Sequence, residues 1–211
     1  MPQPTRATTR ALTALLSVAV AAGALFGTPT AAEAKSYVRS DARGDMTEMS
    51  VSPHQPRPDD LRGDIVRIRV RHTANRVQVR IVFADLVKSP DFMYETAVLF
   101  RTNEAVGRHV IQIDSVPHNW QPGFVRWIRY DGQPARCAVH RSHDFVHHVI
   151  LFGFPRRCLS NPRWIRVRVQ MTTARNTGGT MGFAPLLEDD AFRTGIGPDI
   201  PSPLSPRIRR G

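Results

Sequence analysis

The chain has 211 residues and a formal net charge of +11 at pH 7, and 41% of its residues are hydrophobic. This length allows one domain with a sizeable core rather than several domains. Its lysines are Lys35 and Lys88, so almost all of the positive charge is carried by arginine. Two explanations fit this excess: a surface that recognises phosphate or carboxylate groups, or codon bias in a high-GC genome.

The first 34 residues are predicted to be a secretory signal peptide. Arg6 and Arg10 precede an apolar run over 11–26, and Ala32-Glu33-Ala34 forms a small-residue cleavage motif just before Lys35. This order is typical of a signal peptide, and the apolar run is too short for a stable transmembrane span. We therefore expect an extracellular protein that starts near Lys35 and does not span a membrane.

A β-hairpin is the strongest structural prediction. Residues 64–72 and 76–85 alternate apolar side chains with arginine or glutamine, and a break of three residues joins them. Period-two alternation is typical of strands with one buried face. One face should bury Ile68, Val70, Val79 and Ile81, and the other should expose Arg67, Arg69, Arg71 and Arg80.

Similar runs continue along the chain and predict further strands over 96–102, 108–116, 124–130, 136–141, 145–152 and 164–171. Turn signals separate them, including 116–119 and 121–123, and no segment has a sustained helical period. Eight or nine such strands predict an all-β, antiparallel, jelly-roll-like sandwich over 35–192. Residues 182–195 are expected to be irregular, and the proline-rich residues 193–211 should form an extended, mobile tail.

Both cysteines, Cys137 and Cys158, follow the predicted signal peptide. In an oxidising compartment two cysteines most simply form one disulfide, which here would tie the 136–141 strand to the turn after 152. A free catalytic thiol is the alternative, but it would leave the only possible disulfide of the chain unformed.

Short motifs at both ends of the domain resemble known sandwich modules. Asp41-Ala42-Arg43-Gly44-Asp45, followed by Asp64-Ile65, is similar to the start of many exported bacterial β-sandwich domains. The segment 154–159, leading into Trp164-Ile165-Arg166-Val167, is similar to their ending. The chain thus resembles secreted actinobacterial β-sandwich proteins and, more distantly, DOMON-like and family-9-like carbohydrate-binding modules. This resemblance implies a sandwich fold, and a structural calcium ion is common in modules of this kind. Apart from such a calcium ion, no cofactor is expected.

Aspartates cluster near both ends of the domain and are candidate calcium ligands: Asp41, Asp45, Asp64, Asp189 and Asp190. Calcium takes six to eight oxygen ligands, which carboxylates in loops can supply. The spacing of an EF-hand loop is missing, and aspartate next to glycine is also ordinary turn chemistry. Both interpretations therefore stay open.

Two groups of side chains are candidates for ligand binding. Trp120, Trp127 and Tyr130 surround the 121–123 turn, where they form either a platform for sugar rings or part of the core. Arg67, Arg69 and Arg71 would present positive charge on one sheet face. The arginines are not interleaved with stacking aromatics, so nucleic acid is not the expected partner.

The chain has no serine nucleophile elbow and no glycine-rich phosphate loop, and its few glutamates form no recognisable acid pair. We therefore expect a non-catalytic extracellular binding module whose ligand is a glycan or another cell-envelope polymer. The alternative is an exported structural or interaction protein that binds an anionic polymer or a protein through an arginine-rich face.

Overall fold

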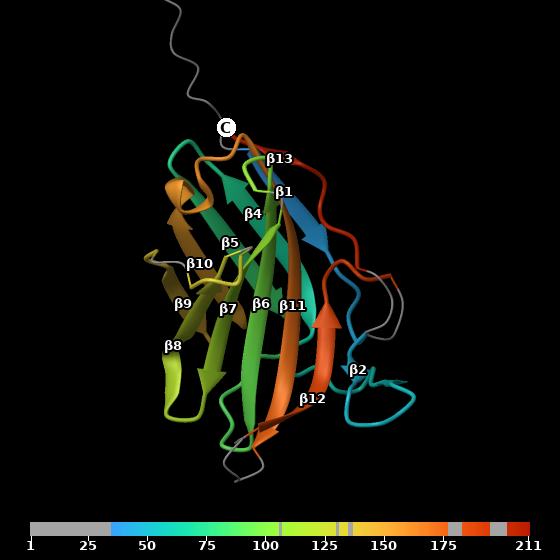
Figure 1. Cartoon of the computed structure of the whole chain (residues 1–211). Coiled ribbons are helices and arrows are strands. Elements are labelled where there is room, and N and C mark those ends of the chain that lie inside the picture. Colours follow the sequence, from blue (N-terminus) through green and yellow to red (C-terminus); the bar gives the residue numbers. More distant parts are fainter. Residues whose placement is uncertain (1–34, 106, 130, 135–136, 177–182, 195–201) are drawn as a thin grey trace, which may run out of the picture. The chain divides into compact units, whose positions relative to one another are not determined.

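The chain folds into two antiparallel sheets that pack as a β-sandwich, which confirms the predicted fold class (Figure 1). The computed structural model describes residues 35–105, 107–129, 131–134, 137–176, 183–194 and 202–211. The expected signal peptide, Tyr130 and residues 195–201 of the expected tail lie outside these ranges. Within them, no helix has the length and apolar character that a membrane crossing requires.

Sheet A has five strands in the order β1-β4-β5-β10-β9. They are β1 (Lys35–Ser40), β4 (Ile65–His72), β5 (Arg76–Phe83), β10 (Val149–Pro155) and β9 (His140–Asp144). The predicted hairpin, β4–β5, lies at its centre. Its burial is confirmed as predicted: the inward-facing Ile68, Val70, Val79 and Ile81 are buried, and the four arginines are exposed.

Sheet B has the order β3-β2-β12-β11-β6-β7-β8, and β13 also pairs with β11. Its strands are β2 (Thr47–Glu48), β3 (Gln55–Pro56), β6 (Phe92–Thr102), β7 (Arg108–Val116), β8 (Asn119–Ile128), β11 (Trp164–Asn176), β12 (Phe183–Asp190) and β13 (Ile208–Arg209). A short 3-10 helix, η1 (Arg156–Leu159), follows β10. With thirteen strands, the described part of the chain has more than the eight or nine expected.

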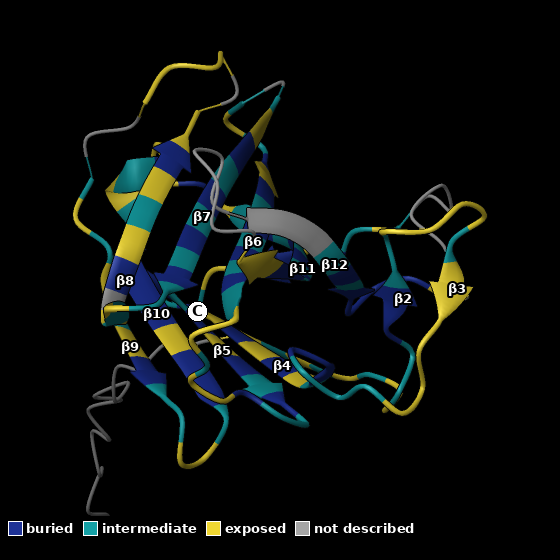
Figure 2. Cartoon of the chain, turned by 90° about the horizontal axis from the view of Figure 1, so that it is seen from below, coloured by how far each residue is buried: buried dark blue, intermediate teal, exposed yellow. Residues whose placement is uncertain are grey.

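The core lies between the two sheets, which Figure 2 shows as separate layers. Phe154 of sheet A contacts two rings of sheet B edge to face, with centroids 5.4 Å from Phe100 and 4.7 Å from Trp127. Phe152, Ile150 and the hairpin residues extend this cluster. Because both inner faces are lined with large apolar side chains, the outer faces are left to carry charge.

The expected turn at 121–123 is instead part of β8. Gly123 adopts a positive φ of 73°, and the pairing of β7 with β8 shifts register between Asp114 and Val116. The glycine therefore marks an irregularity inside a strand rather than its end. Its Cα passes so close to β7 that an added Cβ would lie 2.5 Å from the carbonyl oxygen of Asp114.

Residues 202–211 are packed against the sandwich, which corrects the expectation of a mobile tail for this segment. β13 extends sheet B beside β11, and Ile208 and Ser205 are buried. The Ser205 hydroxyl accepts a 2.9 Å hydrogen bond from the Val167 amide, which lies in β11. Prolines exclude regular pairing over most of this segment, but they do not prevent it from packing.

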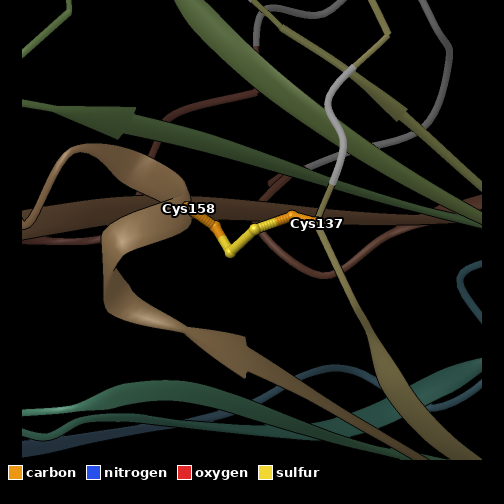
Figure 3. Close-up of a disulfide and its surroundings, with 2 residues drawn as sticks. All are labelled: Cys137 and Cys158. Atoms are coloured by element: carbon orange, nitrogen blue, oxygen red, sulfur yellow. A yellow bond between two sulfur atoms is a disulfide. The ribbon is translucent and has the colours of Figure 1, made fainter.

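The predicted disulfide joins Cys137 to Cys158 (Figure 3). It links η1 to the segment that leads into β9, and both cysteines pack against the core. The 136–141 strand expected beside it begins at His140 instead. The bond therefore tethers a segment without regular pairing to the sandwich.

Candidate functional site

Three of the predicted calcium ligands lie together at one edge of the sandwich. Asp41 and Asp45 lie in the segment between β1 and β2, which runs beside β12 in Figure 1, and Asp189 lies in β12. Each offers a carboxylate oxygen, and these oxygens all lie within 4.8 Å of one another. Asp64, just before β4, adjoins this group and interacts electrostatically with Asp45 and Asp189.

Backbone amides hold two of these carboxylates in place. The Gly44 amide donates to Asp64 Oδ2 at 2.9 Å, and the Ile65 amide donates to Asp189 Oδ2 at 2.6 Å. Gly44 has a φ of 78°, and a Cβ there would lie 2.8 Å from the carbonyl oxygen of Pro58. The glycine of the Asp41–Asp45 motif thus permits the turn that aims its amide at Asp64.

Each carboxylate keeps one oxygen that is out of solvent and accepts no hydrogen bond from the residues that the structure describes. These atoms are Asp41 Oδ2, Asp45 Oδ1, Asp64 Oδ1 and Asp189 Oδ1. The side chains of Asp64 and Asp189 are almost completely buried, with 0% and 1% of their surface exposed. Buried polar atoms are normally paired, so four orphans at one place require a reason.

Burial raises the pKa of all four carboxyl groups. Desolvation, followed by repulsion from Asp45, raises the pKa of Asp41 to about 7. The same two causes raise the pKa of Asp189 to about 9. Desolvation also raises the pKa of Asp45 and of Asp64. The protein alone thus stabilises the charged forms poorly, and either protons or a cation must compensate.

Asp190, the fifth predicted ligand, has a separate structural role. Successive residues of a strand point to opposite faces, so its side chain points away from that of Asp189. Besides desolvation, the charge of Asp190 still contributes to the raised pKa of Asp41 and of Asp45. Its Oδ2 accepts a 2.6 Å hydrogen bond from Arg168 Nε, and its Oδ1 accepts one of 2.7 Å from the Ser202 hydroxyl. Both oxygens are therefore already satisfied without a metal.

The predicted arginines gather on the outer face of sheet A. Cross-strand pairing places five residues in one row across the sheet: Val38, Arg69, Arg80, Leu151 and Ser142. The next row is formed by Ser36, Arg71, Gln78, Gly153 and His140. Neither row contains an acidic side chain.

We call Arg67, Arg69, Arg71, Arg76 and Arg80 the arginine face. All five are exposed, and none forms an ion pair with a residue in the described ranges. Alternate residues of a strand are about 6.6 Å apart and neighbouring strands about 4.8 Å, so these cations are closely spaced in two directions. Two hollows lie over the face, of about 250 Å³ beside Arg69 and Arg80 and about 180 Å³ beside Arg76.

The structure does not assemble the predicted aromatic platform from Trp120 and Trp127. Trp127 is 5% exposed and packs against Phe154 inside the core. Trp120 is half-buried and contacts the rings of Tyr94 and Phe145. Alternation within β8 turns Trp127 inward, while the exposed aromatic side chain of that strand is Phe124.

A third hollow, of about 520 Å³, lies by the loop that follows β6. Trp164, Arg101, Arg166 and Arg207 line it, and the Arg207 guanidinium lies over the Trp164 ring at 4.8 Å. Sequence reasoning did not select this site, because Arg207 belongs to the segment expected to be a mobile tail. Glu104 also lines the hollow, so its three guanidinium groups and aromatic ring face one carboxylate, and the site could contact a sugar that carries both hydroxyl and acidic groups.

No protein-family model, curated protein or solved structure matches the chain.

Proposed function

We propose that the protein is an extracellular binding module that takes an anionic cell-envelope polymer across the arginine face of sheet A. The observation that carries this proposal is the direct pairing of Arg69 with Arg80 in a row that has no acidic residue. Like charges placed opposite each other in a sheet are destabilising. An anion lying over this pair would remove that cost, and Arg71, in the next row beside Gln78, offers it a further contact.

The shape of the face favours a polymer over a compact ligand. The arginines follow two neighbouring strands, and the hollows beside them are small and adjacent because Gln78 and Leu151 line both. A linear chain with regularly spaced phosphate or carboxylate groups can contact several guanidinium groups in turn, and each contact can be bidentate. The exposed Leu151 offers apolar surface to the carbon skeleton of such a chain.

The proposed location rests on two features of the chain. Residues 1–34 have the order of a signal peptide, and a disulfide is retained mainly in oxidising compartments. N-terminal sequencing of the protein recovered from culture medium tests this part of the proposal. A start at Lys35 is expected, and recovery of chains that still begin at Met1 in a membrane fraction would contradict it.

Binding of teichoic acid and of heparin, measured by titration at several salt concentrations, tests the proposed ligand class. Replacing Arg67, Arg69 and Arg71 together by glutamine should weaken binding about 10-fold or more, if each contact contributes about 0.5 kcal/mol. The dependence of affinity on salt should also become shallower, because fewer charges are neutralised.

The matched control replaces three exposed arginines of the other sheet and its flank, Arg108, Arg163 and Arg175, by glutamine. It lowers the net charge by the same amount and should leave binding nearly unchanged. Equal losses in both variants would mean that binding follows net charge, as codon bias implies, and would contradict the proposal. A loss confined to a Trp164→Ala variant would move the ligand to the hollow beside the β6 loop.

A further inference from the structure

We infer that Asp41, Asp45 and Asp189, with Asp64 beside them, form a binding site for one calcium ion. The site lies at the edge of the sandwich where the β1–β2 segment meets β12, and it does not use the arginine face. It is thus a second site with its own ligand, independent of the proposed polymer binding.

The first argument is the buried orphan oxygen of Asp189. This side chain is 1% exposed, its Oδ2 is used by the Ile65 amide, and its Oδ1 has no partner among the residues described. Asp189 also has a carboxylate oxygen within 4.8 Å of oxygens of Asp41 and Asp45. A buried carboxylate with an unpaired oxygen beside two further carboxylates is the environment that a bound cation explains. Turn formation, the alternative role for these aspartates, accounts for the amide contacts but not for the remaining oxygens.

The second argument is that two nearby arginines are already engaged elsewhere and that a third, Arg43, acts on Asp64 through its charge without forming an ion pair. Arg193 Nη1 donates to Glu188 Oε1 at 2.9 Å, and Arg39 donates to the Ala191 carbonyl while its guanidinium lies over the Phe192 ring. Asp41, Asp45, Asp64 and Asp189 form no ion pair within the described ranges. The cluster therefore lacks a protein cation in direct contact.

The donor set selects calcium. All four side chains offer hard oxygen atoms, whereas zinc sites are built mainly from cysteine and histidine. Magnesium usually takes one or two carboxylates and keeps several waters, so a group of three or four carboxylates fits calcium better. Backbone carbonyls or water would complete the coordination.

The site would join parts of both sheets. Asp64 directly precedes β4 of sheet A and Asp189 lies in β12 of sheet B, while Asp41 follows β1 and Asp45 precedes β2. Calcium bound there would clamp the two layers along one edge, and would hold the long connection between β1 and β4.

Titration of the EDTA-treated, dialysed protein with calcium chloride tests the inference directly. Calorimetry should give one ion per chain. At about 100 times the dissociation constant, calcium should raise the Tm by about 5 °C or more. Magnesium at the same concentration should shift the Tm less.

Asp45→Asn and Asp189→Asn should each weaken calcium binding by about 10-fold or more, because each removes a charged ligand. The control Asp59→Asn alters an exposed aspartate of the same β1–β4 connection and should bind like the wild type. If the wild-type protein does not bind calcium after EDTA treatment and dialysis, or if all the variants bind it equally well, the inference is overturned. Loss of heparin binding in the arginine variant bears only on the polymer, so the two proposals are tested separately.

Discussion

Single carboxyl groups dictate how the stability of this protein should respond to pH. Asp41 and Asp189 keep their protons in the folded state up to pH values of about 7 and about 9, but release them near 3.8 when the chain unfolds. Between these values the folded state binds more protons than the unfolded state. Without a cation, their contribution to stability is therefore complete below pH 3.8 and is lost as the pH rises through 7 and 9.

An Asp189→Asn variant isolates this effect. Buried His72, His109 and His143 have lowered pKa values through desolvation, and they act in the opposite direction below pH 6.5. Their contribution cancels when the variant is compared with the wild type. In EDTA, the unfolding free energy of the variant should rise relative to the wild type between pH 6.5 and 9. Denaturant titrations check this, and a difference that is constant with pH would contradict it.

Gly123 is a residue at which a single methyl group should be costly. Gly123→Ala places a Cβ 2.5 Å from the Asp114 carbonyl oxygen at a φ of 73°, and should destabilise the fold by about 2 kcal/mol or more. Gly132→Ala is the matched control, because its φ of 75° is similar but no atom lies within 4 Å of its Cβ position. Thermal unfolding should show the larger loss for Gly123. Equal losses would mean that β7 yields to the methyl group.

At the scale of elements, substitutions in β13 test whether the C-terminal segment stabilises the sandwich. Ile208 is buried beside β11, and its carbonyl accepts a 3.0 Å hydrogen bond from the Nδ1 of buried His72. Ile208→Ala should lower the unfolding free energy by about 2–4 kcal/mol through the cavity it leaves. The exposed neighbour Arg209→Ala should change it by about 0.5 kcal/mol or less. Equal effects of the two substitutions in denaturant titrations would contradict the packing of β13.

The strands whose inward faces could be predicted are those with the clearest alternation, whereas weaker runs predicted only that a strand was present. β4 and β5 alternate apolar and polar residues over eight positions each, so their type and inward faces were predictable. β2, β3 and β13 have two residues each, which is too short for any period to appear. β12 contains Pro185 and ends in three acidic residues, so its pairing with β11 depends on the neighbouring strand rather than on its own pattern.

The acidic cluster could likewise be predicted only in part, because it depends on which strands become neighbours. The five candidate aspartates were visible as two groups far apart in sequence, but nothing in the sequence showed that the groups meet. Pairing of β12 with β2 and β11 brings them together, and strand alternation then separates Asp189 from Asp190. For the aromatic candidates, the inward orientation of Trp127 depended on the boundaries of β8, which begins five residues before the predicted strand.

At the scale of the whole molecule, the disulfide closes a segment with a sequence separation of 21 residues. Replacing Cys137 and Cys158 together by serine should destabilise the protein by about 3 kcal/mol, because the unfolded chain regains the freedom of that loop. Denaturant titration of the double variant against the wild type measures this. A loss of less than about 1 kcal/mol would mean that strand pairing already restrains the segment.

His72 is the point at which both ends of the folded unit meet. Lys35 pairs with His72 across β1 and β4, and the Gly211 amide donates a 3.0 Å hydrogen bond to the carbonyl of the same residue. The path of the chain through the sandwich is therefore almost a closed ring. A short linker from 211 to 35 could close that ring, and the Thr73-Ala74-Asn75 turn of the β4–β5 hairpin, in which Ala74 and Asn75 are exposed, offers a place to open it. A circularly permuted chain would then keep every strand neighbour. Because the two ends lie close together, the sandwich could also be inserted into a loop of a longer polypeptide without separating the ends of that loop.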